Sequence, residues 1–397
     1  MIFFLCAHLV IFFYLLFRVV LPLDVSGKMR VFLALLLLVT SQHYLVRFAF
    51  GNLSSPEIPR VFIIIEGWCF ATVLGLFLLV LARDCLLLLR RIFGGSGRKK
   101  GTRRIFSGKF PGKKNSRHSS GRRKAVLALT AMAAAPAAYG VKQGIVIPPV
   151  RERSAELPNL PRELEGLTIA HITDLHVTRL FGPDWLQAVV ERVNAIKPDL
   201  ILFTGDMIDG QPELRTMDVL ALGELRAKYG VYGCVGNHEY YSGYRFWMSR
   251  LRELGMTMLE NGHRIIEING KELVVVGVTD PVAVQFGLPE PDIAAALAGA
   301  PASAFKIMLD HRPAAFARHA AAGADLVLSG HTHGGHVLGM DRLVARINNG
   351  YVYGWYAAQA ARMYVSSGAG LWDGFPVRLG VDSEIAKITL QAPAFTA

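Results

Sequence analysis

Five short apolar runs, each ending in a cluster of histidine, aspartate or asparagine, constrain the fold more than any other feature of this sequence. The runs cover residues 167–172, 200–203, 231–235, 305–309 and 326–328. Short apolar runs bounded by glycine and polar residues are typical of buried β-strands. Helical patterns lie between some of them, at 183–196 and 214–228, and this alternation predicts an α/β domain. In such sheets ligands collect at the carboxyl ends of the strands, which is where the polar clusters fall.

Residues 264–279 show a different pattern. Two apolar segments flank the dipeptide Asn269-Gly270, which is a strong signal for a tight β-hairpin turn. We therefore expect an antiparallel hairpin within the same domain.

The first third of the chain is far more apolar than the rest. Three stretches are long enough to cross a bilayer as helices: residues 2–23, 31–50 and 61–82. Residues 90–124 then hold fourteen Lys or Arg and no Asp or Glu, so the net charge of +12 comes from this linker. Because basic loops stay in the cytoplasm, we expect the linker and the loop with Lys28 and Arg30 inside, and the loop near residues 54–57 outside.

The basic linker has a second interpretation. A run of this kind can bind nucleic acid, but a juxtamembrane segment explains it more simply because apolar spans adjoin it. We therefore expect the lipid bilayer, and not nucleic acid, as the partner of this part of the chain.

Residues 125–149 decide on which side of the membrane the globular part lies. The stretch is apolar and alanine-rich, contains Lys142 and three prolines, and follows Arg122-Arg123, a loose match to a twin-arginine signal. If it crosses the bilayer, the globular part faces the periplasmic side of a bacterial inner membrane; if it lies in the interface, the globular part is cytoplasmic. We favour crossing. The expected organisation is three transmembrane helices at 1–89, a cytoplasmic linker at 90–124, a fourth membrane segment at 125–149 and the globular domain at 150–397.

The polar clusters contain the residue types that bind divalent metal ions. Asp174 and His176 are two residues apart, so on an extended segment their side chains share a face and can reach one ion. Asp206 is a carboxylate at a strand end that could bridge two cations. The other candidate ligands are the amide oxygen of Asn237 and the imidazoles of His311, His331 and His333. Nitrogen and oxygen ligands without thiolates suit Mn, Fe or Zn, of which we favour Mn.

Such a ligand set predicts hydrolysis of a phosphate ester or anhydride. Two ions roughly 3.5–4 Å apart can polarise the phosphoryl oxygens and hold an activated water in line. They also offset the negative charge that develops on the transferring group. His238 directly follows a candidate ligand, where it could protonate the leaving oxygen. The apolar first third suggests that the phosphorylated small-molecule substrate is lipid-linked.

The motifs D-x-H, G-D-x-x-D, G-N-H-E, a lone histidine and G-H-T-H occur in this order. Over residues 165–390 they resemble the calcineurin-like metallophosphoesterase superfamily, which implies two β-sheets packed together with helices outside. The resemblance implies one metal bound by Asp174, His176, Asp206 and His333, and a second bound by Asp206, Asn237, His311 and His331. It also implies that His238 is the catalytic histidine and that Asp209 and Glu239 orient the ligands.

The C-terminal motifs resemble one branch of that superfamily, the bacterial membrane-associated phosphodiesterases. They are His311-Arg312-Pro313, residues 330–335, residues 366–370 and Arg378. Some members of this branch act as UDP-diacylglucosamine pyrophosphatases in lipid A synthesis. The chain departs from the branch at His336 and at residues 381–383.

Two classes of function remain open at this point. The first is a membrane-anchored phosphodiesterase or pyrophosphatase that uses two metals to activate water. The second is a metal-binding scaffold or a receptor-like membrane protein without hydrolase activity, against which the complete ligand set argues. His171 and His263 lack counterparts in the family, so we expect them to be structural.

Overall fold

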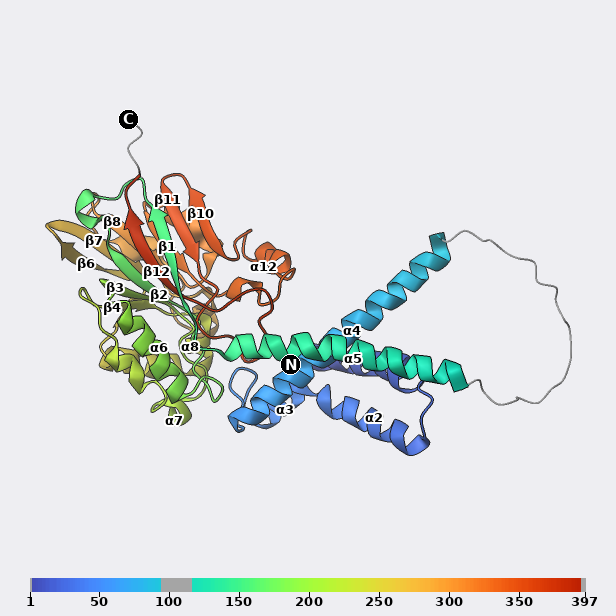
Figure 1. Cartoon of the computed structure of the whole chain (residues 1–397). Helices are drawn as coiled ribbons and strands as arrows, with labels where there is room; N and C mark the ends of the chain where they lie inside the picture. The colour runs from blue at the N-terminus through green and yellow to red at the C-terminus, as the bar shows by residue number, and fades with distance from the viewer. Residues whose placement is uncertain (1, 94–115, 394–397) are drawn as a thin grey trace, which may run out of the picture. The chain divides into compact units, whose positions relative to one another are not determined.

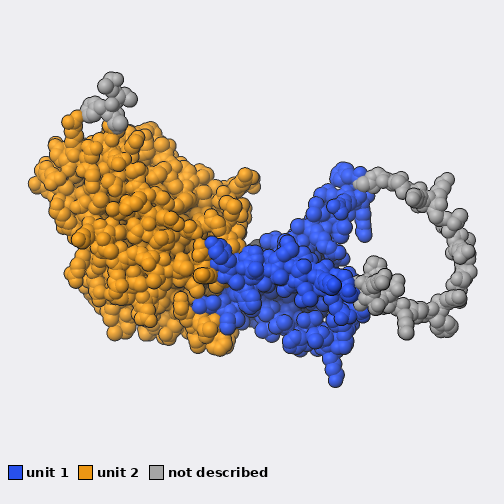
Figure 2. Space-filling view, in the orientation of Figure 1, with its two compact units in different colours: residues 1–46, 64–139 blue, residues 47–63, 140–397 orange. Residues whose placement is uncertain are grey.

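The computed structural model describes residues 2–93 and 116–393 of the chain. The chain divides into two compact units (Figure 2): unit 1 contains residues 1–46 and 64–139, and unit 2 contains residues 47–63 and 140–397. Unit 2 therefore contains the whole expected domain at 150–397 and adds two segments from the apolar part of the chain. Of the basic linker expected at 90–124, residues 94–115 lie outside the described residues.

The N-terminal part of the chain is helical (Figure 1). Its elements are α1 (Ile2–Leu15), a π-helical turn η1 (Leu16–Val20), α2 (Gly27–Thr40), α3 (His43–Ala49), α4 (Arg60–Phe93) and α5 (Ser116–Ile145). Among the described residues, α4 and α5 are long and apolar enough to cross a membrane, and α2 and α3 qualify only as a pair bent by 59°. The expected span at 61–82 lies within α4, whereas the expected span at 31–50 is interrupted between α2 and α3. The apolar helical stretch Cys6–Val20 is shorter than these spans.

Unit 1 holds its helices together mainly with apolar side chains. Leu15, Val80 and Ala133, from three different helices, belong to one buried cluster. Asp84 on α4 accepts hydrogen bonds from Tyr14 Oη at 2.8 Å and from Arg18 Nε at 2.6 Å. Charged groups on apolar helices are tolerated when they are paired in this way.

Unit 2 contains two six-stranded sheets. The first sheet has the order β1 (Val150–Glu156), β12 (Ile385–Gln391), β2 (Thr168–Ile172), β3 (Leu200–Thr204), β4 (Val231–Cys234) and β5 (Thr257–Met258). The second has the order β10 (Gly354–Ala358), β11 (Ala361–Val365), β9 (Leu326–Ser329), β8 (Phe305–Leu309), β7 (Lys271–Gly277) and β6 (Gly262–Ile268). Strands β2, β3 and β4 are parallel, and so are β7, β8, β9 and β11. All five apolar runs recognised in the sequence are therefore strands with parallel neighbours.

The core of unit 2 lies between the two sheets. Leu273 and Val275 of β7 point into this core together with Leu202 of β3. Val274 and Val276 belong to a second buried cluster on the opposite face, which also includes Phe316. Because both faces of β7 are covered, its sequence is a continuous apolar run rather than an alternation. The predicted α/β fold of two packed sheets with helices outside is confirmed.

Helices and short turns connect the strands. The α-helices of unit 2 are α6 (Pro183–Ala195), α7 (Pro212–Arg215), α8 (Asn237–Ser242), α9 (Tyr244–Glu253), α10 (Ile293–Leu297), α11 (Phe316–Ala321) and α12 (Asp341–Ile347). The 3₁₀ turns are η2 (Arg162–Leu164), η3 (Leu220–Glu224), η4 (Pro281–Phe286), η5 (Pro313–Ala315) and η6 (His333–Gly335). The helix predicted at 183–196 is confirmed by α6. The predicted hairpin is confirmed by β6 and β7, whose turn has φ of 51° at Asn269 and 78° at Gly270.

The helix predicted at 214–228 is wrong. Only α7 and the 3₁₀ turn η3 form in and beside this segment. A helix would have to bury its apolar face, but the side chains of Leu214 and Met217 are 47% and 70% exposed, whereas Arg215 is fully buried. The segment therefore buries Arg215 instead of the apolar side chains on which the helical prediction was based.

Candidate metal centre

The predicted metal ligands lie in the segments that directly follow five strands, where Asn237 is the first residue of α8 and His333 the first of η6. Asp174 and His176 follow β2, Asp206 follows β3, Asn237 and His238 follow β4, His311 follows β8, and His331 and His333 follow β9. Backbone hydrogen bonds join these loops to one another. The N–H of Asp174 donates to the carbonyl of Gly205 at 3.0 Å, and the N–H of Gly330 donates to that of His311 at 3.0 Å. The predicted site residues are thus brought together at the carboxyl ends of both sheets.

Five of these residues have a left-handed backbone, which amino acids other than glycine rarely adopt. The angle φ is 55° at Asp174, 46° at His176, 52° at Asp206, 69° at His331 and 48° at His333. Asp174 and His176 are therefore not on an extended segment. Their side chains do face the same site, but the predicted reason, alternation along a strand, is wrong. Backbone of this kind persists only where surrounding structure holds it, and it is concentrated at functional sites.

Two glycines allow the loops to approach the carboxylates closely. A Cβ at Gly236 would lie 2.2 Å from Oδ1 of Asp206, and a Cβ at Gly330 would lie 2.2 Å from Oδ2 of Asp174. Any side chain at either position would displace a ligand carboxylate. This contact explains why both the G-N-H-E and the G-H-T-H motif begin with glycine.

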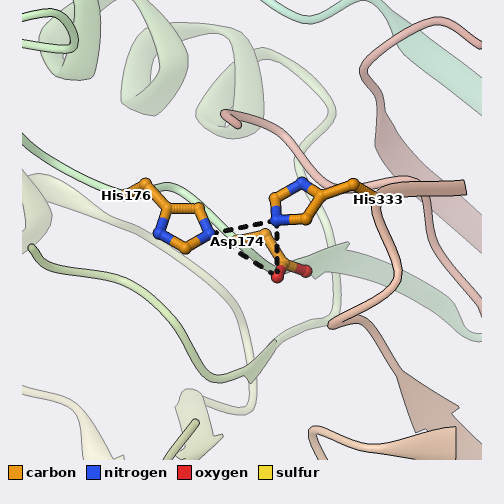
Figure 3. Close-up of side chains that lie close together, drawn as sticks. All are labelled: Asp174, His176 and His333. Carbon is orange, nitrogen blue, oxygen red and sulfur yellow. Dashed lines mark hydrogen bonds and ion pairs between the residues drawn. The ribbon is translucent and has the colours of Figure 1, made fainter. Parts of the chain in front are cut away.

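The first half of the centre consists of Asp174, His176 and His333 (Figure 3). Nε2 of His176 lies 3.1 Å from Nε2 of His333, and these atoms lie 3.8 and 3.5 Å from Oδ1 of Asp174. His176 donates its Nδ1–H to Oδ2 of Asp209 at 2.8 Å, so Nε2 is the nitrogen left to face a metal. Two imidazole nitrogens and a carboxylate oxygen that converge in a buried site form a suitable ligand set for a divalent ion.

The second half consists of Asp206, His311 and His331. Nε2 of His311 lies 3.1 Å from Oδ2 of Asp206 and 3.2 Å from Nδ1 of His331. The Nδ1–H of His311 donates to the backbone carbonyl of Thr204 at 2.7 Å. This bond fixes the ring direction and leaves Nε2 as the nitrogen that can bind a metal once its proton is displaced.

Asp206 lies between the two halves. Its Oδ2 is 3.9 Å from Nε2 of His176 and 3.9 Å from Nε2 of His238. Asn237 contributes a buried Oδ1 that has no hydrogen-bond partner among the described residues. Buried polar atoms are rarely left without a partner, so this oxygen fits the role of a metal ligand.

Two buried carboxylates support the ligand loops. Glu239 accepts backbone N–H groups from Asp206 at 3.1 Å, Met207 at 2.6 Å and Gly236 at 2.8 Å. Asp209 accepts the Nδ1–H groups of both His176 and His238. The geometry matches the expectation that these two residues orient the ligands and the candidate catalytic histidine.

Without metal, the two histidines of each half have pKa values shifted in opposite directions. Burial favours neutral His311, but the charge of Asp206 outweighs it and raises the pKa of His311 to about 10. Burial, with the charges of His311 and Arg312, lowers the pKa of His331 to about 3. In the first half, carboxylates outweigh burial and raise the pKa of His176, whereas burial lowers that of His333. Each half therefore contains one protonated and one neutral histidine.

Two arginines take part in the centre without having been assigned a role from the sequence. Arg378 is fully buried and donates to the carbonyls of Ser367 at 2.7 Å, Gly370 at 2.6 Å and His333 at 3.3 Å. Arg312 donates to Asp280 at 2.7 Å and places Nη1 3.5 Å from Nε2 of His331. In the sequence, both arginines belong to motifs that resemble the phosphodiesterase branch. Those motifs did not indicate which groups the arginines would contact.

The other histidines lie outside both halves. Nε2 of His171 is hydrogen-bonded to Oγ1 of Thr204 at 2.8 Å, and Nδ1 of His263 donates to the carbonyl of Ala296 at 2.8 Å. His336 packs against the ring of His333, with ring centroids 4.6 Å apart. These contacts agree with structural roles for His171 and His263.

Comparison with known proteins identifies the domain. The sequence model described as calcineurin-like phosphoesterase matches residues 167–335. An uncharacterized metallophosphoesterase of Campylobacter jejuni is 31% identical over 253 residues, which cover 63% of this chain and 65% of that protein. A transmembrane protein with metallophosphoesterase domain from Danio rerio is 31% identical over 283 residues, which cover 68% of this chain and 63% of that protein. The match thus spans less than two thirds of the length of either relative.

A third relative is matched over most of its length. An uncharacterized metallophosphoesterase of Aquifex aeolicus is 31% identical over 249 residues, which cover 61% of this chain and 91% of that protein. The family match contains all the predicted metal ligands and His238. The chain therefore belongs to the calcineurin-like metallophosphoesterase family.

Proposed function

We propose that the protein is a membrane-anchored, metal-dependent phosphodiesterase or pyrophosphatase. The observation that carries the proposal is the pair of buried ligand clusters joined by Asp206, with His238 beside them. Family membership supports the reaction class. The relatives named above are themselves uncharacterized or named only by their domain, so the substrate is inferred from chemistry.

The roles of the protein groups follow from their geometry. Two divalent cations held by these ligands would polarise phosphoryl oxygens and activate a water. His238 donates Nδ1–H to Asp209, which leaves Nε2 on the side of Asp206. Burial favours its neutral form, but the charges of Asp209 and Asp206 outweigh burial and raise its pKa above the usual value. When it is protonated, His238 could give the proton on Nε2 to the leaving oxygen.

Arg312 is a cation that could contact the substrate. Asp280 holds two of its nitrogens, at 2.7 and 3.1 Å, while its side chain remains 31% exposed beside His331. A guanidinium held in this way is suited to a phosphate oxygen, because its planar N–H groups match that geometry.

The apolar helices support a lipid-linked substrate and anchorage in a bilayer. Helix α4 exposes large apolar side chains, among them Val61 at 56%, Phe62 at 57% and Leu78 at 54%. Exposed apolar surface of this extent marks contact with lipid or with another protein. An enzyme held at a bilayer has direct access to phosphorylated lipids, which is why we place its substrate in that class.

We further propose that α5 crosses the membrane and that the catalytic domain is periplasmic. Residues 47–63 and 140–397 form one compact unit, so the loop near 54–57, expected outside, and the domain share one side. A reporter fused after Ala397 tests the proposal. Activity of a reporter that works only outside the cytoplasm supports it, and activity of a reporter that works only in the cytoplasm contradicts it.

The function is tested with the full-length protein, stripped of metal and reloaded with Mn. We expect hydrolysis of bis-p-nitrophenyl phosphate or UDP-diacylglucosamine that requires metal and is lost in Asp206→Asn. The ratio of the two rates separates a broad phosphodiesterase from a pyrophosphatase of lipid precursors. Two bound metals without hydrolysis of either compound would instead favour the metal-binding scaffold.

A further inference from the structure

The loop between α3 and α4 belongs to the same compact unit as the metal centre. This α3–α4 loop, residues 50–59, precedes the first metal ligand by more than a hundred positions and lies outside the family match at 167–335. The side chain of Asn52 accepts the N–H groups of Ser54 at 2.9 Å and Ser55 at 2.8 Å. The loop is thus internally ordered rather than an extended connection.

Its main contact is an ion pair with a buried guanidinium. Arg215 is fully buried, and its Nη2 donates to Glu57 Oε1 and, at 3.4 Å, to Ser55 Oγ. Nη1 donates to Asp218 at 3.2 Å. A buried charge is tolerated only when it is paired, and removal of one partner leaves an uncompensated charge.

This ion pair lies next to Gly210, which follows the carboxylate that orients His176 and His238. A Cβ at Gly210 would lie 2.8 Å from Ser55 Oγ and 3.2 Å from Arg215 Cγ. Ser55 and Arg215 therefore pack closely against Gly210, the residue that follows Asp209, and leave no room for a side chain there. Asp209 in turn accepts the Nδ1–H groups of His176 and His238, so Gly210 is the direct neighbour of the carboxylate that both imidazoles share.

Two further contacts tie this part of the chain to segments close to the metal centre. Arg60 Nε donates to the carbonyl of Leu180 at 2.9 Å, four residues after His176. Trp372 Nε1 donates to Ser54 Oγ at 3.0 Å, two residues after Gly370, whose N–H is bonded to the carbonyl of Asp174. The loop and its flanking residue thus contact the chain after the ligand segments that follow β2 and β3, and the segment after β11 that is bonded to Asp174.

A buried carboxylate beside the last contact interacts with the same part of the chain. Asp373 is fully buried, as is Arg47 at the start of the segment that contains the loop. Burial raises the pKa of Asp373 to about 7, and the charge of Arg47 acts in the opposite direction.

We propose that the α3–α4 loop is a positioning element of the metal centre, in which Glu57 acts through Arg215 to hold Gly210 and Asp209. This role rests on the proposed function. The alternative is a tether that attaches the domain to its helices without influencing the ligands. A tether influences folding only, whereas a positioning element also changes metal affinity and the rate of the chemical step.

The test uses the full-length protein and the variants Glu57→Gln and Glu57→Gln/Arg215→Met. The single variant leaves Arg215 without its main partner, so we expect lower thermal stability, weaker Mn binding and a lower kcat. The double variant removes both charges, so we expect most of the stability to return, although Asp218 loses its partner. Mn affinity and kcat should stay about 10-fold below wild type, the lower end of effects seen for groups that orient metal ligands. KM should change little, because neither residue touches the substrate.

Arg179→Gln is the matched control. Arg179 pairs with the other oxygen of Glu57 at 3.3 Å, but its side chain is 54% exposed, and exposed ion pairs contribute little. We expect wild-type Mn affinity and kcat from this variant. Double-variant values equal to wild type in both Mn affinity and kcat would overturn the inference.

Metal binding separates this inference from the proposed function. If wild type binds Mn but hydrolyses neither compound, the proposed activity is wrong. The Mn affinity of the Glu57 variants, compared with wild type, still tests whether the loop positions the metal ligands. If wild type binds no Mn, both the proposed function and the positioning role are wrong.

Discussion

Each half of the metal centre has two histidines and an aspartate of its own, and Asp206 of the second half also lies close to the first, but the histidines of the two halves are supported differently. In the first half, Nδ1 of His176 donates to the carboxylate of Asp209. In the second, Nδ1 of His311 donates to the backbone carbonyl of Thr204, at the end of β3. One histidine is thus oriented by a side chain that sequence change can remove, and the other by the sheet itself.

This difference has a consequence for the sensitivity of each half. A carboxylate partner increases the basicity of the imidazole as well as fixing its direction. It also connects the first half to His238 and, through Gly210, to the α3–α4 loop. We therefore expect the first half to respond to distant substitutions and the second half to respond mainly to changes of its own ligands.

The largest effect is expected from the residue that both halves share. Asp206→Asn removes the negative charge between them and should lower hydrolysis by about 1000-fold or more. The metal content of both halves should fall, as measured by elemental analysis of the purified protein. Near-normal turnover with full metal content would contradict the bridging position of Asp206.

His238→Ala should separate chemistry from metal binding. Because His238 lies beside both halves without being one of the predicted ligands, the metal content should remain, while kcat falls by about 100-fold or more. Loss of both metals in this variant would show that His238 is a ligand or a structural residue instead.

Asp209→Asn tests the difference between the halves directly. It removes the carboxylate that supports His176, so the first ion should bind about 10- to 100-fold more weakly while the second keeps its affinity. Mn titration followed by electron paramagnetic resonance resolves the two binding steps. Asp199→Asn is a suitable control, because Asp199 accepts from Thr168 at 2.9 and 2.8 Å in the same sheet. If both ions bound equally more weakly, the two halves would not differ in their dependence on Asp209.

The last prediction concerns pH, which should change metal affinity in the same direction in both halves. The raised pKa of His311, about 10, means that this ligand is protonated at neutral pH without metal, and the pKa of His176 is raised in the same direction. Each ion must displace about one proton, so the affinity for both ions should rise with pH, and for the ion bound by His311 the rise should level off near pH 10. Titration in buffers of different ionisation enthalpy measures the protons released. Binding that does not depend on pH would contradict the charge distribution derived for the metal-free centre.

Some parts of this protein could be predicted from local sequence alone. The ligand clusters directly follow the apolar runs that form β2, β3, β4, β8 and β9, and parallel strands bring their carboxyl ends together. The hairpin at Asn269-Gly270 was equally predictable, because the turn requires a positive φ at both residues. In both cases the determining interactions are between residues close in the chain.

The sequence by itself determined which side chains gather at the metal centre and that they belong to a two-sheet α/β domain. Only the tertiary structure decided that Asp174 and His176 have left-handed backbones, that Arg378 holds the loop of His333, and that residues 214–228 are not a helix. It also decided that the α3–α4 loop belongs to the catalytic unit. The ion pair of Glu57 with Arg215 joins residues 158 positions apart, and such a contact leaves no periodic pattern in the sequence, because its energy depends on burial that the whole fold creates.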